Sequence, residues 1–63
     1  MKHYRFGYID KTIMLTRVFE CDARDANTAF FYFVTTMESK FGNNAPDLIM
    51  LLEVYENGVS IDW

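Results

Sequence analysis

The C-terminal stretch "LIMLLEVYENGVSIDW", residues 48–63, contains the strongest structural signal in the chain. Asn57-Gly58 separates two apolar, partly alternating segments, and this dipeptide favours a two-residue hairpin turn because both residues tolerate a positive φ. The turn fixes a register in which Glu56 faces Val59 and, further along, Glu53 faces Asp62. Alternation then predicts a core-facing set of side chains: Leu48, Met50, Leu52, Val54, Val59, Ile61 and Trp63.

The remaining positions of this hairpin point away from the predicted core, and they include apolar side chains as well as charges. Ile49, Leu51 and Tyr55 are expected at the apolar centre of an open sheet face, with Glu53 and Asp62 as its charged part. Two facing carboxylates are unfavourable unless a cation lies nearby. That cation is either a lysine or arginine on the next strand, which makes the pair an ordinary solvated face, or an arginine on a partner protein.

The N-terminal third predicts a second hairpin. "HYRFGYI", residues 3–9, alternates with period two, and "TIMLTRVFEC", residues 12–21, is rich in β-branched and apolar residues. With "DK" at 10–11 as the turn, Tyr8 faces Ile13 and Phe6 faces Leu15. The core-facing side of this hairpin then carries Phe6, Tyr8, Ile13, Leu15 and Phe19, and the opposite side carries Arg5, Ile9, Met14, Thr16 and Val18.

A helical period follows, starting between residues 23 and 26 and ending at Phe41, just before Gly42. Asp22 or Asp25 can cap its first turn, and the sequence leaves both possibilities open. The 3.6-residue period predicts one core stripe: Ala26, Phe30, Phe33, Val34, Met37 and Phe41. Phe31 and Tyr32 fall outside this stripe. "GNNAPD", residues 42–47, is expected to be a loop.

These segments predict a single domain over residues 1–63 with the order β-β-α-β-β. One helix can cover one face of a four-stranded antiparallel sheet, which gives a two-layer α+β fold. A short crossover between the hairpins favours the strand order 2-1-3-4. With 63 residues, of which 51% are hydrophobic, the domain is small and rich in apolar residues for its size.

Composition also indicates where the protein acts. The single cysteine, Cys21, excludes an internal disulfide framework and fits a reducing compartment. The longest apolar run, "LIMLL", is far shorter than a membrane span, and the N-terminus does not resemble a signal peptide. We therefore expect a soluble, cytoplasmic protein that does not bind membranes.

Charge is distributed unevenly along the chain. Residues 1–24 contain five basic and three acidic side chains, whereas residues 25–63 contain one basic and six acidic ones, for a net charge of -3. An acidic protein repels phosphate, so nucleic-acid binding is an alternative rather than the leading hypothesis. The same polarity favours a partner with a basic surface, or a second copy in the opposite orientation.

The residue types that perform catalysis are sparse. His3 and Cys21 fall on opposite faces of the first hairpin, which argues against a Cys–His nucleophile pair. No phosphate-binding loop, metal-binding motif or nucleophile motif is present. We therefore predict no catalytic, metal-binding or cofactor-binding residues. A small enzyme would need an interfacial site built from two copies, and this is the third hypothesis.

The apolar side chains that the core does not use are the best functional signal. Phe31 and Tyr32 lie outside the helix stripe, and Ile49, Leu51 and Tyr55 lie on the open sheet face. Contiguous exposed apolar residues are typical of interaction surfaces. In size, acidity and lack of catalytic groups the chain is similar to small phage-encoded inhibitor proteins. The leading hypothesis is a non-enzymatic protein-interaction domain, self-associating as a homodimer, that binds and blocks a larger protein.

Overall fold

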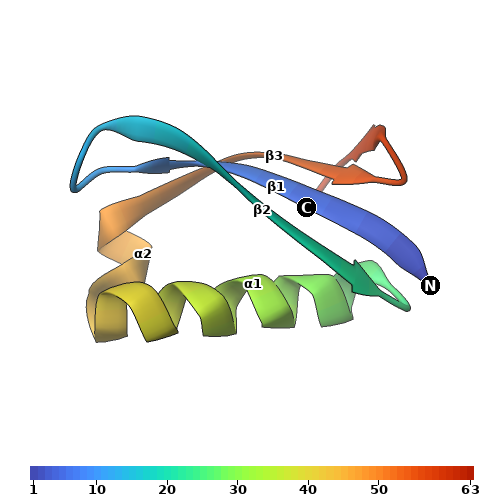
Figure 1. The fold of residues 1–63 in the computed structure, drawn as a ribbon, viewed down its shortest axis with the longest axis horizontal. Helices are drawn as coiled ribbons and strands as arrows, with labels where there is room; N and C mark the ends of the chain where they lie inside the picture. The colour runs from blue at the N-terminus through green and yellow to red at the C-terminus, as the bar shows by residue number, and fades with distance from the viewer.

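The computed structural model describes residues 1–63 and confirms the two-layer α+β fold (Figure 1). The strands and helices follow the order β-β-α-β-β, with short helical turns before the second hairpin. Their bounds are β1 Lys2–Asp10, β2 Leu15–Ala23, α1 Ala26–Phe41, the 3-10 turn η1 Gly42–Asn44, the single-turn helix α2 Ala45–Leu48, β3 Ile49–Glu56 and β4 Val59–Ile61.

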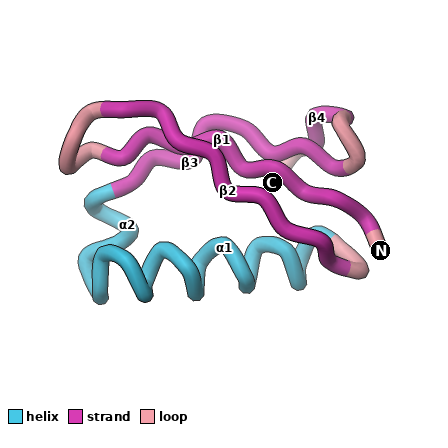
Figure 2. The backbone as a smooth tube through the Cα atoms, viewed as in Figure 1, coloured by secondary structure: helices cyan, strands magenta, loops and turns pink.

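The four strands form one antiparallel sheet in the order β2-β1-β3-β4, as predicted. Helix α1 lies along one face of this sheet, and α2 connects it to β3 on the same side (Figure 2). No helix lies on the opposite face. The candidate functional site lies on this uncovered face.

The core forms where the period-two face of β1 meets the helix. Tyr4, Phe6 and Tyr8 are buried, and the ring of Phe33 from α1 stacks on Phe6 with centroids 4.8 Å apart and planes at 4°. Phe30 meets the same Phe6 ring edge-on at 5.1 Å. The predicted core roles of both helix phenylalanines are therefore confirmed, with Phe33 buried and Phe30 partly buried.

The ends of α1 resolve the capping alternatives. Asp25 is the N-cap, and its carboxylate accepts a hydrogen bond of 2.8 Å from the Thr28 N–H. Gly42, at φ 71, ends the helix and donates its N–H to the Glu38 carbonyl. One stripe residue was predicted wrongly: Val34 is 49% exposed. The buried stripe is centred on Ala29, Phe33 and Met37, which rotates Val34 to the helix flank.

The first hairpin has the predicted faces but a different register. Its turn spans Lys11–Met14 rather than residues 10–11, so Phe6 pairs with Phe19 and not with Leu15. Asp10 remains in β1 because its carboxylate accepts hydrogen bonds from the N–H and hydroxyl of Thr12. The predicted core residues Ile13 and Leu15 consequently lie at the exposed end of the hairpin.

The prediction of a loop over "GNNAPD" was also wrong, because this segment forms η1 and most of α2. Pro46 lies in the first turn of α2, where its missing N–H costs no helical hydrogen bond. Ala45 is buried against the core. The segment lacks a helical period because each helical piece is too short to show one.

A β-bulge in β3 changes which of its side chains face the helix. Gly7 pairs with Glu53, but the next residue of β1, Tyr8, pairs with Leu51, so Leu52 is the extra residue. Beyond it the alternation is inverted. Ile49 and Leu51 therefore pack against the core, whereas Met50 is 48% exposed and Leu52 is also exposed. The predicted positions of these four residues were wrong.

The second hairpin keeps the register that Asn57-Gly58 predicts, but only over its first three pairs. Val54 pairs with Ile61, Tyr55 with Ser60 and Glu56 with Val59. Strand β4 ends at Ile61, so the predicted Glu53–Asp62 pair is not formed in the sheet. Val59 and Trp63 are exposed and are not core residues.

Candidate functional site

The uncovered face of the sheet, called the open face below, is built from alternate residues of the strands. The pairing registers place their side chains in four rows across the sheet. The rows are Asp22 beside His3; Glu20, Arg5, Tyr55 and Ser60; Val18, Gly7 and Glu53; and Thr16, Ile9 and Met50.

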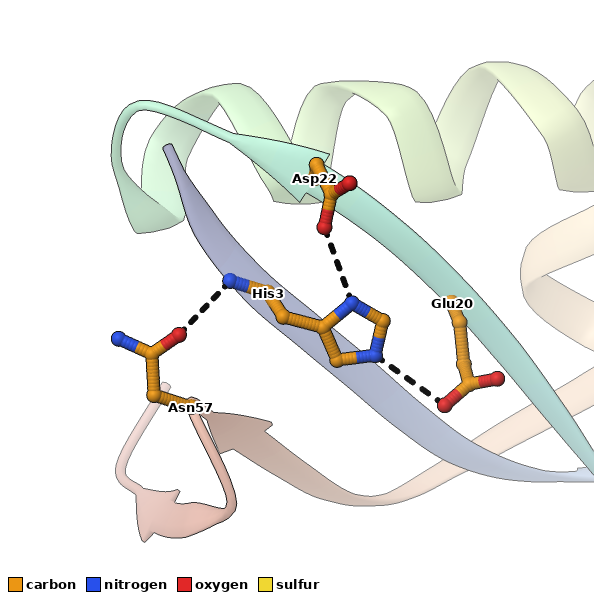
Figure 3. A network of polar contacts seen from close by, with 4 residues as sticks. All are labelled: His3, Glu20, Asp22 and Asn57. Carbon is orange, nitrogen blue, oxygen red and sulfur yellow. Dashed lines mark hydrogen bonds and ion pairs between the residues drawn. The ribbon is translucent and has the colours of Figure 1, made fainter.

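The first two rows contain a histidine held between two carboxylates (Figure 3). His3 Nδ1 lies 3.0 Å from Asp22 Oδ1, and His3 Nε2 lies 3.2 Å from Glu20 Oε1. The backbone of His3 also donates to Asn57 Oδ1 at 2.9 Å and accepts from the Asn57 N–H at 2.7 Å. These contacts attach the start of β1 to both β2 and the turn between β3 and β4.

Protonation of the imidazole decides the strength of this cluster. An ionised carboxylate only accepts hydrogen bonds, so both ring nitrogens donate at once only in the imidazolium form. The hydrogen bond to Asp22, followed by that to Glu20, raises the pKa of His3 above its ordinary value of 6.5. When His3 is protonated, its charge on β1 offsets the adjacent negative charges on β2.

We expect the contribution of His3 to folding stability to depend on pH. Because its folded pKa is raised, the contribution is fully present below 6.5 and is lost as the pH rises through the folded value. Urea denaturation of the natural protein and of His3→Gln, at pH values from about 5 upward, measures it. The difference between the two proteins should shrink with rising pH. A difference that stays constant would contradict the charged cluster.

A second cluster lies in the middle of the open face. The Arg5 guanidinium lies 4.9 Å from the centroid of the Tyr55 ring, within cation–π range. The Tyr55 hydroxyl donates to Glu53 Oε2 at 2.9 Å, and this hydrogen bond is the main cause that raises the pKa of Tyr55. Glu53 extends over Gly7, where an added Cβ would approach its Cγ to 3.1 Å. Glycine therefore gives Glu53 room to lie across β1.

The other end of the open face is apolar. Val18 is 57% exposed at the edge, Ile9 is partly buried in the centre, and Met50 is about half exposed on β3. Leu52, the extra residue of the bulge, is also exposed. The bulge produces this patch, because it turns Met50 away from the helix side. The open face thus has an apolar end and a charged end.

The predicted interaction residues are distributed over four places. Glu53 and Tyr55 lie on the open face as expected. Ile49 and Leu51 were predicted at the centre of that face but pack toward the helix instead. Asp62 is exposed beyond the end of β4. Phe31 and Tyr32 are exposed on α1, with ring centroids 6.3 Å apart. The two aromatic residues and the open-face pair therefore do not form one continuous site.

Sequence reasoning missed the cluster around His3. Its members belong to the open face in the observed register, where His3 pairs with Asp22 and Arg5 pairs with Glu20. A predicted turn at 10–11 places these acidic residues beyond the end of β1, so the cross-strand charges are not recognised. The alternation of acidic residues at positions 20 and 22 could have indicated the cluster. These residues are matched with Arg5 and His3, however, only when the turn is placed correctly.

Two further observations concern other parts of the molecule. Cys21 packs against the core on the side of the sheet opposite to His3, and burial raises the pKa of its thiol.

The structure contains no pocket and no group of three or more His, Cys, Asp or Glu side chains placed to hold a metal ion. Neither helix is long and apolar enough to span a membrane.

Comparisons of the chain with protein families, with curated proteins and with solved structures found no match.

Proposed function

We propose that the protein is a non-enzymatic interaction domain whose open face binds a basic surface on a larger protein. One observation carries the proposal: the uncovered face combines exposed apolar side chains at one end with a carboxylate cluster at the other. Protein interfaces use the same combination, in which apolar burial supplies affinity and charged groups set orientation. Blocking the partner's own surface is how such a domain would act as an inhibitor.

The carboxylates of the open face can still accept hydrogen bonds from a partner. Glu20, Asp22 and Glu53 each use one oxygen in an internal contact, and the other oxygen of each has no internal hydrogen bond. The side chains of Glu20 and Asp22 are more than half exposed. An arginine presents two parallel N–H groups that suit such oxygens. This supports a partner that offers arginine side chains.

Charge also favours protein over nucleic acid as the partner class. The open face carries three carboxylates, against the cation of Arg5 and the titrating imidazole of His3. A phosphate backbone would be repelled by this balance. A basic protein surface would be attracted, and its association rate would fall as salt increases.

We expect Met50→Lys and Glu53→Lys to weaken partner binding by tenfold or more, about 1.4 kcal/mol each. The first places a charge in the apolar end, and the second reverses a carboxylate that faces the partner. The test begins with capture from the native host lysate and identification of the bound protein. Calorimetry with the purified partner then measures the affinity of each folded variant, as judged by circular dichroism.

Phe31→Ala is the matched control, because Phe31 is exposed on α1 and lies away from the open face. It should bind the partner with the affinity of the natural protein. If Phe31→Ala abolishes binding while Met50→Lys and Glu53→Lys do not, the helix is the binding surface and the proposal is wrong. A captured nucleic acid in place of a protein would likewise contradict it.

A further inference from the structure

Strand β2 is a long edge strand, and its outer side has no neighbour in the sheet. Its pairing with β1 runs without a shift from Lys2–Ala23 to Asp10–Leu15. Natural proteins protect exposed edges with proline, charged side chains (lysine above all), bulges or very short strands. The sequence of β2, "LTRVFECDA", contains no proline and no lysine, and β2 has no bulge. Its charged residues are Arg17, Glu20 and Asp22, and the two acidic ones contact His3. The opposite edge strand, β4, covers only Val59–Ile61.

We propose that β2 pairs in antiparallel fashion with β2 of a second copy, which joins two sheets into one of eight strands. A twofold axis that reverses both the strand direction and the edge must be perpendicular to the sheet. Both helices then lie on the same side, and both open faces form one continuous surface. Directly opposite residues must come from the same face, so one residue of β2 lies directly opposite its own copy, and the axis lies midway between these two copies.

Charge selects which residue lies opposite its own copy at the axis. An axis at Arg17 places the two arginines directly opposite each other, and an axis at Glu20 does the same for two carboxylates. An axis at Cys21 places Glu20 opposite Asp22. With an axis at Phe19, the two Glu20 side chains become diagonal neighbours. Glu20 contacts His3 at 3.2 Å, so it relieves that repulsion only by giving up this contact.

An axis at Val18 separates the carboxylates of the two copies. Glu20 then lies opposite Thr16 of the second copy, whose hydroxyl can donate to it. The two Arg17 side chains are diagonal in this register, but Arg17 has no internal hydrogen bond or ion pair and is free to extend. The register therefore avoids the acidic repulsion that a chain of net charge -3 would otherwise increase.

The same register gives the exposed side chains of β2 suitable neighbours. Val18, which is exposed in the single copy, lies directly opposite Val18 of the second copy on the open face. On the helix side, Arg17 lies opposite the half-buried ring of Phe19, an arrangement that allows a cation–π contact. Leu15 and Cys21 form the outermost apolar pair. Each of these pairs between the two copies covers part of the β2 edge that β1 does not contact.

Cysteine cross-linking tests both the pairing and its register. In a Cys21→Ser background, Val18→Cys brings two thiols onto directly opposite residues, about 4.5–5.5 Å apart at Cα. This spacing fits a disulfide. Thr16→Cys is the control on the same strand, since its two copies lie about 13 Å apart in this register. Under mild oxidation, Val18→Cys should form covalent dimers at least tenfold faster than Thr16→Cys.

Light scattering of the natural protein should give twice the 7.4 kDa mass of the chain. A monomer at the concentration of a nuclear magnetic resonance sample would overturn the proposal, as would equal cross-linking rates at the two positions. Met50→Lys should remain a dimer, because Met50 lies on β3 and not at the β2 edge. Loss of the dimer in this variant would assign self-association to the open face instead. The variant thus separates the failure of this proposal from that of partner binding.

Discussion

Phe33→Ala should lower the free energy of unfolding by about 3–5 kcal/mol, the range found for large aromatic truncations in protein cores. Phe33 stacks on Phe6 at 4.8 Å, and it also meets Tyr8 at 5.6 Å and Phe19 at 5.7 Å. Alanine leaves a cavity at the point where the helix meets two strands. Small domains have total stabilities near this loss, so a large fraction of the variant should be unfolded in buffer.

Phe31→Ala provides the control for this experiment, because it removes the same side chain two positions earlier in the same helix. Phe31 is 67% exposed, so its removal leaves no cavity. Urea denaturation followed by circular dichroism should show little change, within about 0.5 kcal/mol. Equal losses for both variants would mean that the helix is rotated about its axis relative to the sheet. Ligand or partner must be absent from both measurements, since binding to the native state adds stability.

The parts of the fold that the sequence predicts correctly are those where two signals agree. Asn57-Gly58 defines a turn whose chemistry admits one register, and the pairs from Val54–Ile61 to Glu56–Val59 follow from it. Helix α1 combines a period of 3.6 with a glycine stop and a capping aspartate, which the sequence left as Asp22 or Asp25 and the structure places at Asp25. The strand order then follows from the short connection between the helix and the second hairpin.

The errors arise where a local signal is weak or has several solutions. Asp10-Lys11 is a poor turn dipeptide, and Asp10 instead bonds to Thr12 and moves the turn toward Met14, which adopts φ 54. Every residue in "LIMLL" is apolar, so no polar position marks where the alternation changes. The bulge is set by pairing with β1, which lies far away in the sequence. Single-sequence alternation does not contain that information.

The sequence predicted that the candidate site is an uncovered sheet face, but it predicted only some of the residues on that face. Alternation indicated an uncovered sheet face, and it correctly assigned Glu53 and Tyr55 to that face. On β3 the apolar part moved from Ile49 and Leu51 to Met50, because the bulge inverts that strand, whereas Val18 was already predicted on this face. The charged part gained His3 with its two carboxylates once the first hairpin took its observed register.

The two proposed surfaces are compatible within one assembly. Pairing through β2 uses the backbone edge, and its twofold axis leaves both open faces on the same side. A dimer would therefore present two copies of the same docking surface to a larger partner. Two linked sites raise the apparent affinity for a partner with repeated basic elements, because the second contact forms intramolecularly. Self-association would then have a functional role besides the added burial.

Leu51→Lys should lower the free energy of unfolding by about 2 kcal/mol or more, because it places a cation among side chains that pack on the core. Leu51 pairs with Tyr8 and contacts the apolar cluster that includes Phe33. Simple alternation from Val54, which is fully buried, would instead place Leu51 on the open face. The size of the effect thus tests directly whether the bulge at Leu52 exists.

Met50→Lys is the matched control for the bulge, since it changes the adjacent residue to the same side chain. Met50 is about half exposed and lies opposite Ile9 on the open face, so lysine there can reach water. Its unfolding free energy should change by about 0.5 kcal/mol or less. The two effects would exchange in a regular strand, where Met50 and Leu52 would share the helix side with Val54. Urea midpoints of the two variants, compared with the natural protein in one buffer, therefore decide which face of β3 the partner can reach.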